Sequence, residues 1–286
     1  MRSAFSVTKA LKAAAGFLPQ AWAGAWLALI LLFAVVVGVP LVLSRYANLL
    51  PMPLAAAPLI AVFLILLVKL VAQGALYRIA LFGNSVRTQD LGFGGVQIAR
   101  PELRLLLASL VVAAFIAVIA ATLFVVFAIA LSLSGLAAGY ENSLAAVCAM
   151  VKRHAGIDYL FLGYIAAAGV FMLFVALKFV LMPAANIAGS RLVTLNALGL
   201  SSGNVGKLFL GLVALVLPFA VIYGLAARHF GPEILLAYLL PHAFGPADRV
   251  LALHAGMQAL SLFVLLPLVV GFLASAYRQI VANRSK

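Results

Sequence analysis

The chain has 286 residues, of which 67% are hydrophobic and only 9% are charged. Its mean hydropathy of +1.24 excludes a soluble globular domain, in which about half of the residues are apolar and about a quarter are charged. The 19 Lys and Arg outnumber the 6 Asp and Glu and give a formal net charge of +13. Because each membrane span uses about 20 residues, several spans leave no room for a large domain outside the membrane.

The first predicted element is a basic amphipathic helix over residues 1–20. Four apolar side chains share one face of a helical wheel, namely Val7, Leu11, Ala14 and Leu18. Thr8, Lys9 and Lys12 point the other way, whereas Phe5 falls outside the apolar face. We expect this segment to lie on the cytoplasmic membrane surface, with its lysines among anionic headgroups. A solvated basic tail is the alternative.

Six apolar stretches follow, each long enough to cross a bilayer. They lie near residues 22–43, 53–77, 105–131, 159–183, 208–227 and 250–277, and none of them contains Asp or Glu. Pro183, Pro218 and Pro267 fall within the last three stretches, where each proline permits a kink. The sequence therefore predicts an all-α polytopic membrane protein with a single integral membrane domain over residues 1–286.

Basic residues are divided unequally between the two sides of this membrane domain. One side holds twelve Lys and Arg against two acidic residues, a balance of +10, and the other holds five against four, a balance of +1. Because cytoplasmic loops are enriched in Lys and Arg, we expect both termini to be cytoplasmic. The basic face predicts contact with anionic membrane lipid, for which the candidate residues are Arg87, Arg100, Arg104 and Arg191.

The even-numbered spans end in similar sequences. The second ends with ALYR at residues 75–78, the sixth with SAYR at 275–278, and the fourth more loosely with AGSR at 188–191. Three copies of one helical hairpin, each closed by Arg, account for this similarity. Chance is the alternative, because Leu, Ala and Arg are common at the inner boundary of any such protein.

The inner loop before the fifth span has a pattern of its own. It contains RL at residues 191–192, SGN at 202–204 and KLF at 207–209. This pattern resembles the inner loop of uncharacterised bacterial six-helix inner-membrane proteins related to the membrane domain of glycerophosphodiester phosphodiesterases. In that group an aromatic residue often precedes the basic one, whereas Val205 and Gly206 stand here. The resemblance implies a six-helix protein of the bacterial inner membrane, and it transfers no catalytic residue.

Motifs of catalysis are missing from the sequence. It contains no HExxH, CxxC, Walker or GxSxG motif, and its one cysteine, Cys148, cannot form an intramolecular disulfide. The glycine-rich run at residues 91–95 has Gln97 where a dinucleotide loop needs its third glycine. A plain turn is the simpler interpretation of this run, and no cofactor is expected.

Two lysines and a group of histidines are the remaining candidates for a site. Lys69 and Lys178 lie inside apolar stretches, so they either extend to the headgroups or line an inward-facing cavity that attracts an anion such as a lipid phosphate. A metal site on the outer side would use these residues: His229, His242, His254 and Glu233. Their spacing matches no zinc motif, so ordinary interfacial histidines are the simpler interpretation.

Three classes of function fit these features. The first is a non-enzymatic scaffold, assembly factor or regulatory subunit with a basic cytoplasmic face, acting with a membrane-protein partner or a second copy of itself. The second is a transporter or lipid-handling protein with a cavity near Lys69 and Lys178. The third is a membrane-embedded enzyme that uses the outer histidines and carboxylates. The lack of catalytic motifs favours the first class, and no nucleic-acid partner is expected.

Overall fold

The computed structural model describes residues 5–46, 56–83, 92–133, 157–189, 192–230 and 248–284, and these residues contain no strand. Six helices are long and apolar enough to cross a membrane, which confirms an all-α, multi-pass membrane protein. The long elements are α1 (Val7–Tyr46), α2 (Ala56–Phe82), α3 (Arg100–Leu133), α5 (Ile157–Phe179), α8 (Val205–Phe230), α10 (Asp248–Leu260) and α11 (Leu266–Arg284). The short elements are η3 (Phe93–Gly95), α6 (Met182–Ala188), α7 (Ala197–Ser201) and the π-helical turn η4 (Ser261–Leu265).

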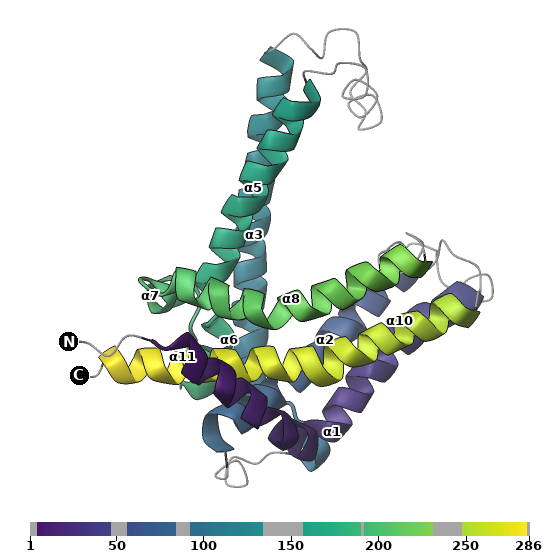
Figure 1. The fold of residues 1–286 in the computed structure, drawn as a ribbon, viewed down its shortest axis with the longest axis vertical. Coiled ribbons are helices and arrows are strands. Elements are labelled where there is room, and N and C mark those ends of the chain that lie inside the picture. The colour runs from purple at the N-terminus through teal and green to yellow at the C-terminus, as the bar shows by residue number, and fades with distance from the viewer. Residues whose placement is uncertain are drawn as a thin grey trace.

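The helices form two groups that diverge from a common base (Figure 1). One group is the antiparallel pair α3 and α5, which stands apart from the other helices at its far end. The other group contains α1, α2, α8, α10 and α11, and within it α1 packs against both α2 and α11. The two groups meet where α6 contacts α2 and α3. The protein is therefore a packed body that carries a projecting helical hairpin.

The most buried spans belong to the body, and the least buried one belongs to the projecting hairpin. In the α10–α11 span 44% of the apolar stretch is buried and in α2 39%, whereas in α3 only 6% is buried. Small residues allow the body helices to cross closely, since a Cβ placed on Gly271 of α11 would lie 3.1 Å from the Cα of Ala14 on α1. The core therefore lies where α1, α2 and α11 cross.

The first part of α1 packs against α11. Ala14 is buried as the wheel predicted, and Lys9 and Lys12 are exposed. The wheel was wrong about Phe5, which is buried and packs edge-on against Phe272 with ring centroids 6.2 Å apart. Phe5 precedes the first helical residue, so the helical wheel does not govern its direction. The apolar face of this segment thus packs on the protein's own core.

A bend at Ala25 separates this first part of α1 from its membrane-crossing part, because the backbone there leaves the helical region with φ −123° and ψ 22°. The turn η3, here called the glycine turn, packs against this bend. Gly94 and Gly95 have φ of +60° and +83°, values that favour glycine, and a Cβ on Gly95 would lie 2.9 Å from the Cα of Ala25. The glycines therefore serve a tight turn and a close helix contact, as the simpler interpretation of this run predicted.

Pro183 and Pro267 lie next to irregular parts of their helices. Pro183 lies in the first turn of α6, directly after the break that ends α5, and Pro218 lies inside α8. Pro267 lacks the N–H that would bond to the carbonyl of Phe263 in a regular α-helix, and Trp22 Nε1 donates to that carbonyl at 2.7 Å instead. The irregularity in the last span is thus compensated by a hydrogen bond from α1.

Candidate functional site

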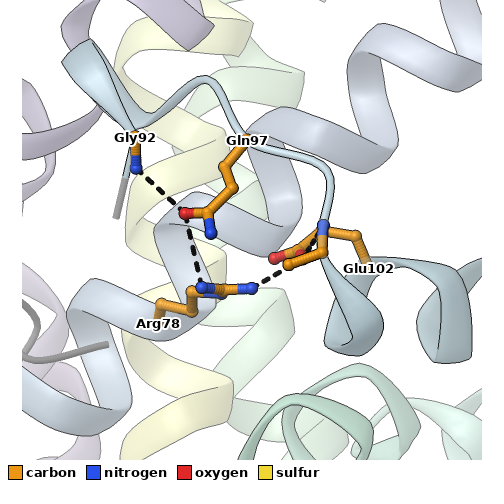
Figure 2. A network of polar contacts seen from close by, with 5 residues as sticks. Arg78, Gly92, Gln97 and Glu102 are labelled. Carbon is orange, nitrogen blue, oxygen red and sulfur yellow. Dashed lines mark hydrogen bonds and ion pairs between the residues drawn. The ribbon is translucent and has the colours of Figure 1, made fainter. Parts of the chain in front are cut away.

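A buried ion pair joins the end of α2 to the start of α3 (Figure 2). Arg78 Nη2 and Glu102 Oε2 are 2.6 Å apart, and only 5% and 2% of the two side chains are exposed. The backbone N–H of Ala99 donates to the same carboxylate oxygen at 3.0 Å. Glu102 lies in the first turn of α3, where the partial positive charge of a helix N-terminus also stabilises a carboxylate.

Two further residues complete this cluster. Gln97 Oε1 accepts hydrogen bonds from the N–H of Gly92 at 2.9 Å and from Arg78 Nη1 at 3.5 Å, so it links the ion pair to the glycine turn. Gly74 lies one turn before Arg78 on α2 and leaves space for the carboxylate, since a Cβ there would lie 2.8 Å from Glu102 Cγ. Figure 2 shows Arg78, Gln97 and Glu102 converging from a helix, a turn and a second helix.

Sequence analysis did not predict this cluster. The apolar pattern places the start of the third span near residue 105, whereas α3 begins at Arg100 and the apolar segment at Phe93. The inference that no span contains a carboxylate is thereby corrected. The sequence does contain a signal for the start of α3. Pro101 is followed by the acidic residue Glu102, and this order is typical of a first helical turn.

The ion pair links α2 to α3, and its burial leaves a substrate no access to it. Both side chains are more than nine-tenths buried, and a charge buried in an apolar surrounding needs its partner to stay stable. The pair joins α2 to the first turn of α3, which is the first helix of the α3–α5 hairpin. The ion pair is therefore one of the contacts that attach α3 to the body, beside the packing of α3 against α6.

Two of the arginines proposed for lipid contact lie together on α3. Arg100 and Arg104, one turn apart, line a shallow open groove of about 500 Å³ with Leu103 and Leu107. Arg100 is exposed and Arg104 is partly buried, and the exposed apolar face continues along the helix at Leu110. A positive charge above an apolar stripe suits a phospholipid that stands against the helix. The other two candidates, Arg87 and Arg191, lie outside the described residues.

The two intramembrane lysines have different surroundings. Lys178 Nζ donates to Ser202 Oγ at 3.2 Å and lies 5.4 Å from the ring centroid of Phe174. Ser201 Oγ, at the end of α7, donates to the Lys178 carbonyl at 2.9 Å, so two consecutive serines bond to the backbone and the side chain of this residue. Lys69 is exposed on α2. The Lys178 side chain thus extends toward Ser202, in the segment between α7 and α8. Neither lysine lines the groove on α3.

The outer-side candidates fall mostly beyond what the structure describes. Glu233, His242 and the side chain of His229 lie outside the described residues, whereas His254 is partly buried on α10. Among the described residues, no group of three or more His, Cys, Asp or Glu side chains is placed to hold a metal ion.

The fold and this cluster define a class, a multi-pass helical membrane protein with a packed body and a projecting hairpin fixed by a buried ion pair. Comparison with protein families, with curated proteins and with solved structures finds no match to the chain.

Proposed function

We propose that the protein is a non-enzymatic component of a membrane assembly, a scaffold, assembly factor or regulatory subunit. Its α3–α5 hairpin would pack against a membrane-protein partner, and its basic face would contact anionic lipid. We assign it to the bacterial inner membrane with both termini in the cytoplasm. This assignment is supported by the excess of Lys and Arg on one side and by the resemblance over residues 191–209.

The observation that carries this proposal is the surface of the hairpin. Small residues recur one helical turn apart and are exposed, at Ala113, Ala117 and Ala121 on α3 and at Gly163 and Ala167 on α5. Spacing of this kind lets a second helix approach the backbone closely, and packing of this kind drives helix association in membranes. Lipid chains do not require small side chains at a fixed spacing.

The position of the hairpin supports the same proposal. It diverges from the body, so the body helices do not cover its far half (Figure 1). Large apolar side chains flank the small ones, with exposed fractions of 65% for Val118 and 68% for Val170. Small residues between large apolar ones form the ridges and grooves that helix packing uses. A partner helix therefore has both a groove to enter and side chains to contact.

Photo-crosslinking inside cells tests this contact. We expect a photoreactive residue at Val118 or Val170 to crosslink to one specific membrane protein, identified by mass spectrometry. The matched control is Phe63 on α2, which is also 68% exposed and apolar, and which should crosslink to lipid. A product of twice the monomer mass would assign the contact to a second copy of this chain. Lipid products at all three positions would contradict the proposal.

A substitution on the same face provides a second readout. Ala167→Leu, at an exposed position three residues before Val170 on α5, should abolish the Val170 crosslink, because a larger side chain prevents close approach of a helix. Val118→Leu is the control, since that exposed position already holds a large residue. Both variants should keep the thermal stability of the monomer, because neither position is buried.

The lipid contact has its own prediction. Arg100→Gln with Arg104→Gln should lower the amount of phosphatidylglycerol or cardiolipin that copurifies, because each basic residue near an anionic headgroup contributes about 1 kcal/mol. Native mass spectrometry of the purified protein measures the retained lipid. Most of the basic residues on this side remain in the double variant, so membrane insertion should be unchanged. Equal retention in variant and parent would refute a lipid site on α3.

The other two functional classes have less support. A transporter with a cavity near the lysines has less support because neither Lys69 nor Lys178 lines the groove on α3 or the cavity beside Arg278. An enzyme on the outer side would rest on residues that lie mostly outside the described part of the chain. The hairpin surface therefore favours an assembly component.

A further inference from the structure

Arg278 occupies the place in the last span that Arg78 occupies in the second, since each follows a tyrosine near the end of its span. Their surroundings differ. Arg78 is buried against Glu102, whereas Arg278 is exposed and lines a cavity of about 340 Å³. Among the described residues that line this cavity, none is acidic.

The cavity lies between the first part of α1, the end of α2 and α11. Phe17, Ile79 and Gly271 form an apolar part of its lining, and Gln20 and Arg278 form the polar part. The lining therefore combines hydrogen-bond donors with an apolar wall. Most ligand sites in proteins have this composition, a few polar groups on a largely apolar surface.

Gly16 keeps the α1 wall of the cavity open. A Cβ placed on Gly16 would meet no heavy atom within 4 Å, so no neighbouring side chain fills this space. Lys12 and Gln20 lie one helical turn before and after Gly16, and therefore on the same face of α1. Lys12 is exposed, so a second positive charge stands on the helix face that borders the cavity.

We propose that this cavity binds the phosphate group of an anionic amphiphile. A guanidinium donates two parallel hydrogen bonds to phosphate oxygens, which is the role available to Arg278. The amide of Gln20 donates a further one, and Phe17 and Ile79 contact the non-polar part of the ligand. A lipid headgroup and a free phosphorylated compound share this chemistry. The choice of anion follows from the proposed lipid contact, but the site is separate from the groove on α3.

Native mass spectrometry of the purified full-length protein tests the site, with dioctanoyl phosphatidic acid as the probe and dioctanoyl phosphatidylcholine as the comparator without net charge. Gly16→Leu adds a side chain at the wall of the cavity, where a Cβ meets no atom within 4 Å, and should weaken binding of the acidic lipid about tenfold. Arg278→Gln should weaken it to a similar extent, because a charge-assisted hydrogen bond is lost. An excess of inorganic phosphate serves as a soluble competitor.

Each variant has a matched control. Gly38→Leu changes the same residue type on the same helix, and a Cβ at Gly38 also meets no atom within 4 Å. Arg228→Gln removes an exposed arginine at the end of α8. Both controls should bind the acidic lipid as the parent protein does. Arg100→Gln with Arg104→Gln should also keep binding in this cavity, which separates this proposal from the lipid groove on α3.

The outcomes distinguish the possible ligands. If inorganic phosphate displaces the acidic lipid, the cavity binds phosphate itself, which supports a soluble phosphorylated ligand. If the acidic lipid resists displacement, the result supports a lipid as the ligand of the cavity. Undiminished binding by Gly16→Leu overturns the proposal, even when Arg278→Gln weakens binding, because surface charge alone would then explain the affinity. Equal binding of the two probe lipids overturns the selection for negative charge.

Discussion

Arg78→Met is expected to destabilise the protein by about 3–5 kcal/mol, because it leaves the carboxylate of Glu102 buried without its partner charge. The loss should appear as a lower melting temperature in detergent and as aggregation during size-exclusion chromatography. Only 2% of the Glu102 side chain is exposed, so water does not replace the guanidinium unless the helices separate. Glu102 lies in the first turn of α3, so the attachment of the α3–α5 hairpin to α2 should weaken as well.

Two companion variants make this prediction specific. Combining Arg78→Met with Glu102→Leu should recover most of the stability, because no charge is then left buried. Arg100→Gln, two residues before Glu102 and exposed, should change stability by less than about 0.5 kcal/mol. A single Arg78→Met variant as stable as the parent would show that the pair does not hold α2 and α3 together.

Gly211→Ala is expected to be the second most damaging change, at about 1–3 kcal/mol. A Cβ at this position of α8 would lie 2.1 Å from Phe272 Cζ, so the ring must move. Phe272 is fully buried and packs against Phe5, which leaves the ring little room for such a shift. Thermal unfolding of the purified protein measures the effect.

Gly224→Ala is the control for this substitution. Gly224 lies on the same helix, and a Cβ there would meet no heavy atom within 4 Å. Its stability should equal or exceed that of the parent, because alanine is the better helix former. Adding Phe272→Leu to Gly211→Ala should restore part of the loss, since the smaller side chain frees space. Equal stabilities of the two single glycine variants would refute close packing of α8 on α11.

The membrane class and the number of candidate spans could be predicted from sequence because they depend on local composition. A run of about 20 apolar residues must bury its backbone groups in a helix when it crosses a bilayer, whatever its neighbours are. The boundaries were less predictable. The polar first turn of α3, with Arg100 and Glu102, lowers the hydropathy there and so concealed where the helix starts.

The candidate site could be predicted only in part. The sequence names Arg100 and Arg104 only as basic residues of one side, and the structure places both on α3, one helical turn apart. Pairing of Arg78 with Glu102 joins residues of two different helices, and no periodicity within one helix reports such a contact. The same limit hid the cavity, in which Gly16 of α1 and Arg278 of α11 meet.

Sequence alone determined the all-α membrane class, the six candidate spans and the unequal distribution of charge, because each is a property of composition along the chain. Only the tertiary structure decided that Arg78 is buried and Arg278 exposed, although both end a span with the same Tyr–Arg pair. It also decided that the α3–α5 hairpin projects from the body while α1, α2 and α11 form the core. The physical reason is that each apolar helix can be stable in a bilayer by itself, because its backbone hydrogen bonds are internal. Which helices pack together depends instead on close contact at small residues and on the pairing of buried charges.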